Sequence, residues 1–555
     1  MQLVAYGAQD VYLTGNPQIT FWKVTYRRHT NFALESIEQT FNGQADFGRR
    51  VTCTISRNGD LAYSTYLQVT LPEIGQPLAN GGTSTRENGV YARWLDNPGL
   101  QLIHQVEVEI GGQRIDRQYG DWMHIWNQLT MSAEQERGYN KMIGNTTQLT
   151  YLTDPDFAGV DGPCDTSSPV QVCTPRNALA ETTLYIPLQF WFCRNPGLAL
   201  PLIALQYHEV RINIDLRPID ECLWAMSSMP TTVGTGTTGP GQKVRSAYSQ
   251  TLAAASLYVD YVFLDTDERR RMAQNPHEYL IEQLQFTGDE SVGSSSNKIK
   301  LNFNHPCKEL IWVVQPDANV DYCSSFDPGG ALFNLLGAQP FNYTDGLDVL
   351  PNAFHSFAGP GEASSSDFIY YGSTSGQAQF HDAFGLGLDS TNFPSIGSYP
   401  DGVYGGPAGI GPGGVATGGN DSGSLVSDAG TFVLAETALS MHCWGENPVV
   451  TAKLQLNGQD RFSEREGTYF DLVQPYQHHT RNPDSGINVY SFALRPEEHQ
   501  PSGTCNFSRI DNATLQLILS NATVGGTQTA KVRVYAVNYN VLRVMSGMAG
   551  LAYSN

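Results

Sequence analysis

Two adjacent histidines, His478 and His479, are the residues whose type and spacing suggest metal chemistry, because neutral imidazole is a common metal ligand. Neighbouring side chains in a strand point to opposite faces, so the two rings could not easily share one ion. We therefore expect two partly exposed loop histidines and no metal site.

A glycine-rich stretch at residues 234–239 (GTGTTG) matches the spacing of dinucleotide-binding loops. That motif requires a helix directly after the glycines, because the helix N-terminus receives the pyrophosphate. A Thr/Gly/Pro-rich segment surrounds the glycines here, and no helix pattern follows. The chain also contains no phosphate-binding loop, no His-Glu-x-x-His and no Gly-x-Ser-x-Gly motif. We expect no cofactor and no catalytic residue.

The nine cysteines are scattered, and no two form a Cys-x-x-Cys pair. This pattern indicates free, mostly buried thiols in a reducing compartment. Cys164 and Cys173 share one Pro/Ser/Thr-rich loop and could form a disulfide. We expect no signal peptide, because no basic segment followed by an apolar run opens the chain. No apolar stretch approaches the roughly 20 residues that span a bilayer.

Length and composition indicate a large β-rich protein. The 555 residues can form two or three hydrophobic cores, and 55 glycines with 30 prolines suit many short strands joined by turns. The formal net charge is −21. Proteins that bind nucleic acid in bulk neutralise phosphates with basic residues, so we expect no direct contact with nucleic acid.

Four pairs of segments occur in the same order along the chain, which predicts two copies of one β-fold. Residues 105–110 and 453–456 alternate apolar and polar side chains and run into the hairpin turns Gly111-Gly112 and Asn457-Gly458. The other pairs are residues 34–43 with 280–288, 208–214 with 511–517, and 257–264 with 534–542.

The spacing of the pairs predicts an insertion of about 100 residues in the second copy, before its hairpin. It falls at about residues 316–440, where the chain is rich in Gly, Pro, Ser and Asp. No lysine or arginine occurs between Lys308 and Lys453, so this segment would be repelled by phosphate or by an anionic membrane. We expect it to face bulk solvent and, because it keeps many aromatic residues such as Phe341 and Tyr343, to be mostly ordered on the surface.

The start of the chain is locally basic. Lys23, Arg27 and Arg28 alternate with Phe21, Trp22 and Tyr26. These residues either form a first strand with one solvated face or contact an acidic inner layer, a membrane surface or minor proteins.

Residues 265–275 (DTDERRRMAQN) predict a helix, since acidic residues precede basic ones and Pro276 blocks its continuation. This helix lies between the two copies and would connect them. Its three arginines resemble a nucleic-acid patch, but neighbouring acidic residues compensate their charge.

The opening segment, residues 3–21 (LVAYGAQDVYLTGNPQITF), resembles the N-terminus of major capsid proteins of nucleocytoplasmic large DNA viruses, especially those of phycodnaviruses and mimivirus relatives. Three more blocks are similar to that family. They are residues 186–205 (IPLQFWF, then NPG), 301–306 (LNFNHP) and 535–553, which begins YAVNYNVLR. The blocks lie at both ends and in the middle of the chain.

The resemblance implies an all-β fold of two tandem eight-stranded jelly rolls, a double jelly roll with long loop insertions and a short connector helix. We expect an inner arm at residues 1–25, a first roll at 26–264, the connector at 265–276, a second roll at 277–545 and a tail at 546–555. The family further implies a homotrimeric, pseudo-hexagonal capsomer in an icosahedral shell, in contact with neighbouring capsomers and minor capsid proteins. An internal membrane would lie nearby, and assembly would occur in host cytoplasm.

The same resemblance implies that Lys23, Arg27 and Arg28 lie on the inner side and that insertions form outward towers in contact with the host surface. It also allows virus-encoded glycosylation of outward loops, for which Asn342 and Asn420 are the candidate sites. Two alternatives to a capsid protein have similar sheets: a double β-sandwich enzyme acting on glycans and a lectin-like carbohydrate-binding protein.

Overall fold

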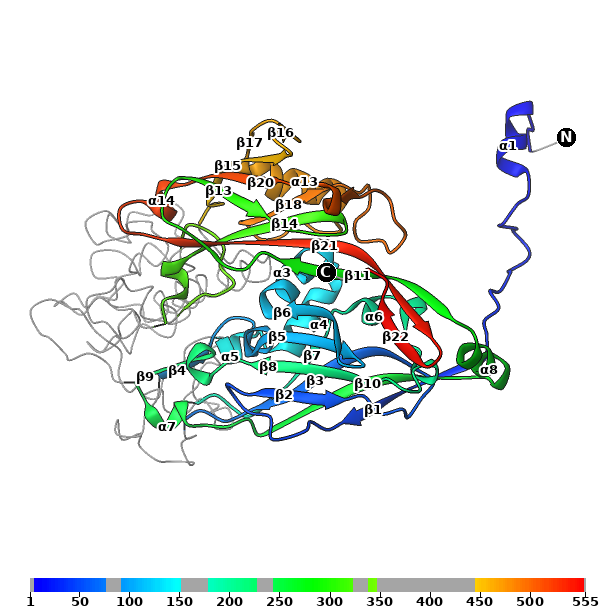
Figure 1. The fold of residues 1–555 in the computed structure, drawn as a ribbon, viewed down its shortest axis with the longest axis horizontal. Helices are drawn as coiled ribbons and strands as arrows, with labels where there is room; N and C mark the ends of the chain where they lie inside the picture. Colours follow the sequence, from blue (N-terminus) through cyan, green and yellow to red (C-terminus); the bar gives the residue numbers. More distant parts are fainter. Residues whose placement is uncertain are drawn as a thin grey trace, which may run out of the picture.

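The computed structural model describes residues 4–75, 91–150, 178–226, 243–322, 338–346 and 445–553, which form two β-sandwiches placed side by side (Figure 1). Both sandwiches are eight-stranded jelly rolls, so the predicted all-β double jelly roll is confirmed.

The first roll contains two four-stranded antiparallel sheets. One has the order β1-β10-β3-β7 and the other β2-β8-β5-β6. The strands are β1 (Phe32–Gln39), β2 (Arg50–Thr54), β3 (Leu61–Leu71), β5 (Ile103–Ile110), β6 (Gln113–Tyr119), β7 (Thr182–Pro187), β8 (Val210–Leu216) and β10 (Ala254–Leu264); β4 (Tyr91–Trp94) and β9 (Leu223–Met226) form an additional pair.

The second roll repeats this order strand for strand, as β11-β21-β14-β18 and β13-β20-β15-β16. Its strands are β11 (His277–Phe286), β13 (Ser296–Leu301), β14 (Pro306–Pro316), β15 (Val449–Leu456), β16 (Gln459–Asp460), β18 (Ile487–Ser491), β20 (Ala513–Leu519) and β21 (Ala530–Met545). The short strands β12 (Glu290–Val292), β17 (Arg465–Glu466), β19 (Cys505–Asn506) and β22 (Met548–Leu551) extend these sheets.

The predicted duplication is confirmed, because each of the four sequence pairs falls on corresponding strands. They lie on β1 and β11, on the hairpins β5–β6 and β15–β16, on β8 and β20, and on β10 and β21. Both hairpin turns have two successive residues with positive φ, Gly111-Gly112 and Asn457-Gly458, as a two-residue type I′ turn requires. The predicted insertion lies between β14 and β15.

Helices are short and lie in the connections. The described α-helices are α1 (Val11–Thr14), α2 (Pro98–Leu102), α3 (Gly120–Thr130), α4 (Ala133–Ile143), α5 (Thr147–Thr150), α6 (Trp191–Arg194), α7 (Arg245–Tyr248), α8 (Thr266–Gln274), α13 (Gln474–His478) and α14 (Asn521–Val524). The 3-10 turns are η1 (Ala8–Asp10), η3 (Pro196–Leu198), η4 (Leu202–Ala204), η5 (Ile219–Glu221), η6 (Asp317–Val320) and η11 (Phe507–Arg509), and η10 (Tyr469–Val473) is a π-helix that runs into α13.

The connector helix predicted between the copies is confirmed as α8, which ends before Pro276. Arg269 joins it to the first roll, because its Nε lies 2.8 Å from the Asp60 carboxylate. The other Asp60 oxygen accepts a hydrogen bond from the backbone N–H of Leu264, at the end of β10. These contacts fix the direction in which the chain leaves the first roll.

The last long strand, β21, belongs to both rolls. Its first half pairs with β14 in the second roll, whereas Leu542 and Val544 pack into the hydrophobic core of the first roll together with Ala549 of β22. The Gly547 carbonyl, in the turn between β21 and β22, accepts a hydrogen bond from the Tyr207 N–H of the first roll. The C-terminal hairpin therefore ties the two rolls together.

The two ends of the rolls differ in what they carry. The N-terminal arm, residues 4–31, leaves the body beside α8 and β22, at the right of Figure 1. β4, β9, α7 and α14 lie at the opposite end. The insertion after β14 begins at this opposite end, because Pro316 pairs with Ala530, close to α14.

Candidate assembly surfaces

The contact between the two rolls, called the seam below, is built on helix α3 of the first roll. Trp122, Ile125, Trp126 and Leu129 follow the i, i+3, i+4, i+7 spacing of one helix face, and all four are buried against the second roll. Met123 points the other way, into the core of the first roll. One helix thus contributes to two hydrophobic cores.

The second roll offers α3 the outward face of its sheet β11-β21-β14-β18. Apolar side chains of three strands form this face, and they are Ile311 and Val313 of β14, Ile487 and Val489 of β18, and Tyr535 and Val537 of β21. Alternate residues of the same strands, such as Leu310 and Trp312, point into the second roll's own core. β14 is therefore buried on both faces, which explains its continuous apolar run.

Gly120 determines how α3 starts. A Cβ at this position would collide with the backbone carbonyl oxygens of Leu100 and Ile103. We predict that Gly120→Ala lowers the free energy of unfolding by about 1–3 kcal/mol, because backbone atoms must shift to make room. Urea unfolding would measure this change.

A matched control is Gly138→Ala in helix α4, where no heavy atom lies within 4 Å of the added Cβ. Alanine there should stabilise the protein by about 0.5–1 kcal/mol, as expected for an open helical position. Equal effects at Gly120 and Gly138 would contradict the close packing of α3.

Ion pairs flank the apolar part of the seam. Asp121 of α3 lies 3.0 Å from Arg533 of β21 and 3.4 Å from Arg217 of the first roll. Arg533 is also 2.8 Å from Asp289. Burial disfavours the charge of Arg533, but Asp121, Tyr535 and Asp289 together outweigh it and raise the pKa of the guanidinium above its ordinary value.

A second ionic cluster joins α6 to the second roll. Glu282 of β11 lies 2.6 Å from the fully buried Lys308 ammonium and 3.2 Å from Arg194 of the first roll. Burial opposes ionisation of Glu282, but Arg194 and Lys308 lower its pKa below the ordinary value. Arg194 also lies over the ring of Trp126, 4.8 Å from its centroid, so the charged cluster and the apolar helix face support one another.

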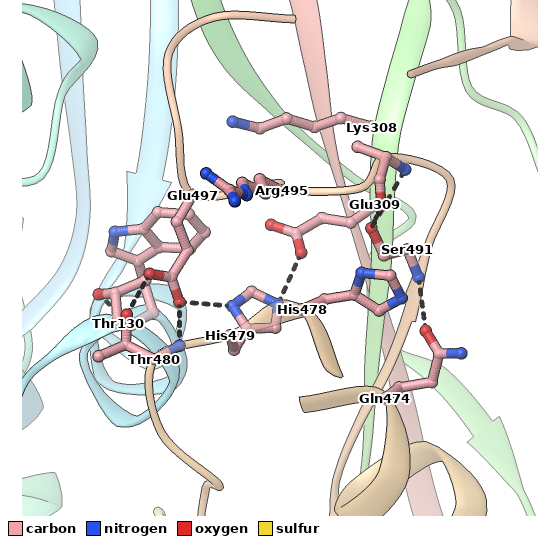
Figure 2. Close-up of polar contacts among 12 residues, drawn as sticks. Thr130, Lys308, Glu309, Gln474, His478, His479, Thr480, Ser491, Arg495 and Glu497 are labelled. Atoms are coloured by element: carbon pink, nitrogen blue, oxygen red, sulfur yellow. Dashed lines mark hydrogen bonds and ion pairs between the residues drawn. The ribbon is translucent and has the colours of Figure 1, made fainter. Parts of the chain in front are cut away.

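His479 lies in a third buried cluster, shown in Figure 2. Its Nε2 is 2.9 Å from Glu309 of β14, and its Nδ1 is 2.9 Å from Glu497. Carboxylates only accept hydrogen bonds, so both ring nitrogens must donate and the ring must be protonated. Burial lowers the pKa of His479, but Glu309 and Glu497 more than compensate and raise it to about 9.

The expected pair of partly exposed loop histidines is therefore wrong for His479, whose side chain is fully buried. His478 is the last residue of α13, and its ring lies 3.1 Å from the Leu494 carbonyl. The two rings therefore have different partners, carboxylates for His479 and a backbone carbonyl for His478. Among the described residues, no cluster of His, Cys, Asp or Glu has the arrangement of a metal site.

Lys23, Arg27 and Arg28 lie in the exposed arm, and the interpretation that they form a first strand is wrong because β1 begins at Phe32. Large apolar side chains of the arm are also exposed, including Phe21, Trp22 and Tyr26. Neither of the two described rolls buries these side chains. The described arm is thus a basic, aromatic segment available to a partner.

Asn342, a candidate glycosylation site, is buried at the base of the insertion. Its Nδ2 donates to the Gln339 side chain and to the Gly346 carbonyl, and its Oδ1 accepts from Thr344. This conformation leaves no room for a glycan on Nδ2, so the structure does not favour Asn342. Asn420 lies outside the described residues.

Tyr343 is likewise buried in the seam, and Phe341 packs on the ring of His124, with centroids 4.6 Å apart. The expectation that these two aromatic residues lie on the outer surface of the insertion is wrong for Tyr343. The insertion starts by covering α3, because the apolar rings exclude water from that helix.

Five cysteines among the described residues carry free thiols: Cys53, Cys193, Cys222, Cys307 and Cys505. Burial raises the pKa of the Cys53 thiol to about 11 and that of Cys222 to about 12, so these two thiols are unreactive. Cys164 and Cys173, the candidate disulfide, and the glycine-rich loop at 234–239 lie outside the described residues. No described helix is both long and apolar enough to cross a membrane.

Two tandem jelly rolls with the same strand order, fixed by a helix and an apolar sheet face, define the class of double jelly-roll proteins. Sequence comparison identifies the family within this class. The profile described as "Large eukaryotic DNA virus major capsid protein" matches residues 268–550, and "Major capsid protein N-terminus" matches residues 20–265. The chain belongs to the family of major capsid proteins of large eukaryotic DNA viruses.

Similar proteins support this assignment over the whole chain. The major capsid protein of Phaeocystis pouchetii virus is 75% identical, with 100% of this chain and 99% of the relative covered. That of Chrysochromulina ericina virus is 72% identical over the same shares. The structure of PBCV-1 VP54, fitted into a reconstruction of the virophage Sputnik, is 33% identical with a TM-score of 0.58, covering 97% of this chain and 100% of that one.

The chain is therefore a structural protein of the virion capsid rather than an enzyme, and the resemblance seen in the sequence is confirmed. The glycan-acting enzyme and the lectin-like protein are set aside as alternatives, because the whole chain matches capsid proteins. Sequence reasoning missed the seam, although the apolar spacing of residues 122, 125, 126 and 129 is a signal that could have identified its helix.

Proposed function

We propose that three copies of the chain form a pseudo-hexagonal capsomer, and that capsomers tile an icosahedral shell with neighbouring capsomers and minor capsid proteins. The observation that carries this proposal is the identical strand order of the two rolls. Each chain supplies two similar bodies, so a threefold ring supplies six and approximates a hexagon. Hexagonal tiles can cover a surface without gaps, and closed rings are the usual symmetry of homo-oligomers.

The arm would lie on the inner side of the shell and the insertion on the outer side. Two observations support this orientation. The arm and the insertion leave the rolls at opposite ends. The arm carries Lys23, Arg27 and Arg28, whereas no lysine or arginine occurs between Lys308 and Lys453. A basic aromatic arm suits minor capsid proteins or an anionic internal membrane, and an acidic insertion suits bulk solvent or a host surface.

Two further features accompany this assembly. The free thiols suit assembly in the reducing host cytoplasm, and the net charge of −21 supports a shell without direct contact to nucleic acid. Virus-encoded glycosylation would use outward loops, with Asn420 as the remaining candidate site.

Sedimentation and imaging of the purified protein test the proposal. We expect a stable particle of about 180 kDa, three times the chain mass of 60.8 kDa, with a hexagonal outline in cryo-EM images. A map of assembled particles should place the arm toward the interior. A chain that stays monomeric at high micromolar concentration would reject the capsomer. A map with the insertion on the inner side of the shell would reject the proposed orientation.

A further inference from the structure

The connection between β16 and β18 in the second roll repeats the one that holds α3 in the first. Each starts with a glycine that is pressed against the first residue of the corresponding strand. A Cβ on Gly120 would collide with the Ile103 carbonyl oxygen at the start of β5, and one on Gly467 with the Val449 carbonyl oxygen at the start of β15. The two glycines are thus structurally equivalent.

The residues after each glycine correspond one by one. Met123 and Phe470, three positions after their glycines, each point into the core of their own roll. Asn127 and Gln474, seven positions after, are both buried polar residues. The seam residues Trp122, Ile125, Trp126 and Leu129 then correspond to Tyr469, Leu472, Val473 and Tyr476.

Helix α3 of the first roll and the helix formed by η10 and α13 in the second roll differ in whether a sheet covers them. The four seam residues of α3 are buried, whereas Leu472 is 50% exposed, Val473 38% and Tyr476 79%. Tyr469 packs partly on the core of its own roll, so the second roll presents three of the four positions of this helix face, without the sheet that α3 packs on. Large apolar side chains gathered on one exposed face indicate a protein contact.

The matching sheet face is present on the first roll. Sheet β1-β10-β3-β7 corresponds to the sheet that receives α3, and its outward face carries Tyr66, Tyr185 and Tyr258 on three neighbouring strands. Tyr66 and Tyr258 are register partners and stack with centroids 5.2 Å apart, and Tyr185 lies 6.2 Å from Tyr66. In the receiving sheet of the second roll, Ile311 and Tyr535 are register partners in the same way.

Two more apolar side chains extend the tyrosine face along β1. Phe32 and Leu34 alternate with inward residues such as Ile37, and both are exposed. The outward face of this sheet is therefore rich in aromatic and apolar side chains, with Ser36 and Glu38 of β1 beside the tyrosines, and it lacks the helix that covers its counterpart in the second roll.

We propose that Leu472, Val473 and Tyr476 of one chain pack on the face formed by Tyr66, Tyr185 and Tyr258 of a second copy of this chain. The contact would repeat between chains the seam that exists within each chain. It joins different surfaces of the two copies, so it runs head to tail and can close a ring. This inference rests on the proposed capsomer and specifies the residues that hold it together.

Charged substitutions on either side of this contact test the proposal. Leu472→Glu with Tyr476→Glu on the helix, or Tyr66→Glu on the sheet, should raise the concentration needed for trimer formation by about 100-fold or more, because the contact would bury unpaired carboxylates. Sedimentation should then show the 60.8 kDa chain. The control is Ile518→Glu, a partly exposed apolar residue on the other sheet, which should leave the trimer unchanged.

A double variant tests the head-to-tail pairing directly. Tyr476→Lys combined with Tyr66→Glu in one chain should restore part of the trimer, since each lysine would meet the glutamate of the next copy. Cysteines at 476 and 66 should likewise give intermolecular cross-links with a short bismaleimide, whereas cysteines at 518 and 66 should not. The cross-link remains informative even if the charged variants fail to fold.

The outcomes separate this inference from the capsomer itself. If the wild-type chain sediments as a trimer and the charged variants do too, or if the 476–66 cross-link is absent, the assigned contact is wrong and the capsomer stands. If the wild-type chain is a monomer, the proposed function fails. Folding of the helix variants is checked by far-UV circular dichroism, whose β-sheet signal should match the wild type because Tyr476 and Leu472 are exposed within the chain.

Discussion

Replacing Trp126 with alanine should lower the free energy of unfolding by about 3–5 kcal/mol, which is the range for removing a buried tryptophan side chain. Trp126 is only 4% exposed, and it packs between Trp122, with ring centroids 5.6 Å apart, and the guanidinium of Arg194. Its loss would also leave Arg194 without the ring that it covers, close to the buried Glu282. The effect should therefore exceed that of an ordinary core residue.

The form of the unfolding transition should change as well. α3 is the apolar contact that makes the two rolls unfold together, so its weakening should split one calorimetric transition into two. Differential scanning calorimetry measures this directly. The matched control is Trp22→Ala in the arm, a tryptophan that is 85% exposed and should leave the transition unchanged. A single, unshifted transition for Trp126→Ala would contradict the role of the seam.

Sequence patterns predicted a duplicated β-fold because its elements have local causes, whereas the jelly-roll topology was implied by the resemblance to the capsid family. Alternating strands, the turn Asn457-Gly458 and the charged connector that ends at Pro276 each have a short-range cause. The duplication then followed from the order of these elements. The insertion was found because the spacing of the paired segments differs by about 100 residues, which can be read from the sequence alone.

The seam could not be predicted in the same way, since its partners are far apart in the chain. Nothing near Asp121 in the sequence indicates Arg533, and within the second roll nothing near His479 indicates Glu309. The sequence shows that residues 310–314 are apolar, but not that alternate side chains serve two different cores. Tertiary contacts decide such cases, and His479 was misassigned because a pair of histidines gives no sign of burial.

Replacing His479 with glutamine should destabilise the protein by about 3–5 kcal/mol near neutral pH. The reason is that Glu309, whose side chain is fully buried, would lose the cation that compensates its charge. Glutamine has no positive charge and cannot donate toward both Glu309 and Glu497 as the protonated ring does. The matched control is His478→Gln, because His478 is the neighbouring residue and its ring hydrogen-bonds the Leu494 carbonyl at the surface.

The stabilisation by His479 should depend on pH in a defined direction. The pKa of His479 is about 9 in the folded chain, compared with an ordinary value of 6.5 for histidine. The folded protein therefore binds the proton more tightly than the unfolded chain does. The contribution of His479 to the free energy of unfolding is then complete below pH 6.5 and is lost as the pH rises through 9. The difference between the two pKa values corresponds to about 3 kcal/mol. Glu497, whose pKa is lowered by His479 and Thr480 despite burial, contributes in the opposite direction and loses its part only as the pH falls below its ordinary range.

Urea unfolding of the wild type and of His479→Gln at pH 6, 7.5 and 9.5 measures this dependence. The stability difference between them should be largest at pH 6 and smallest at pH 9.5. Asp116 of β6 accepts a hydrogen bond from the Leu284 N–H of the second roll, and burial raises its pKa to about 7, which also weakens the wild type as the pH rises. Asp116 is present in both proteins, so the comparison cancels its contribution. If the stability difference between the wild type and His479→Gln were constant across the three pH values, His479 would not be protonated. Another group would then have to compensate the charges of Glu309 and Glu497.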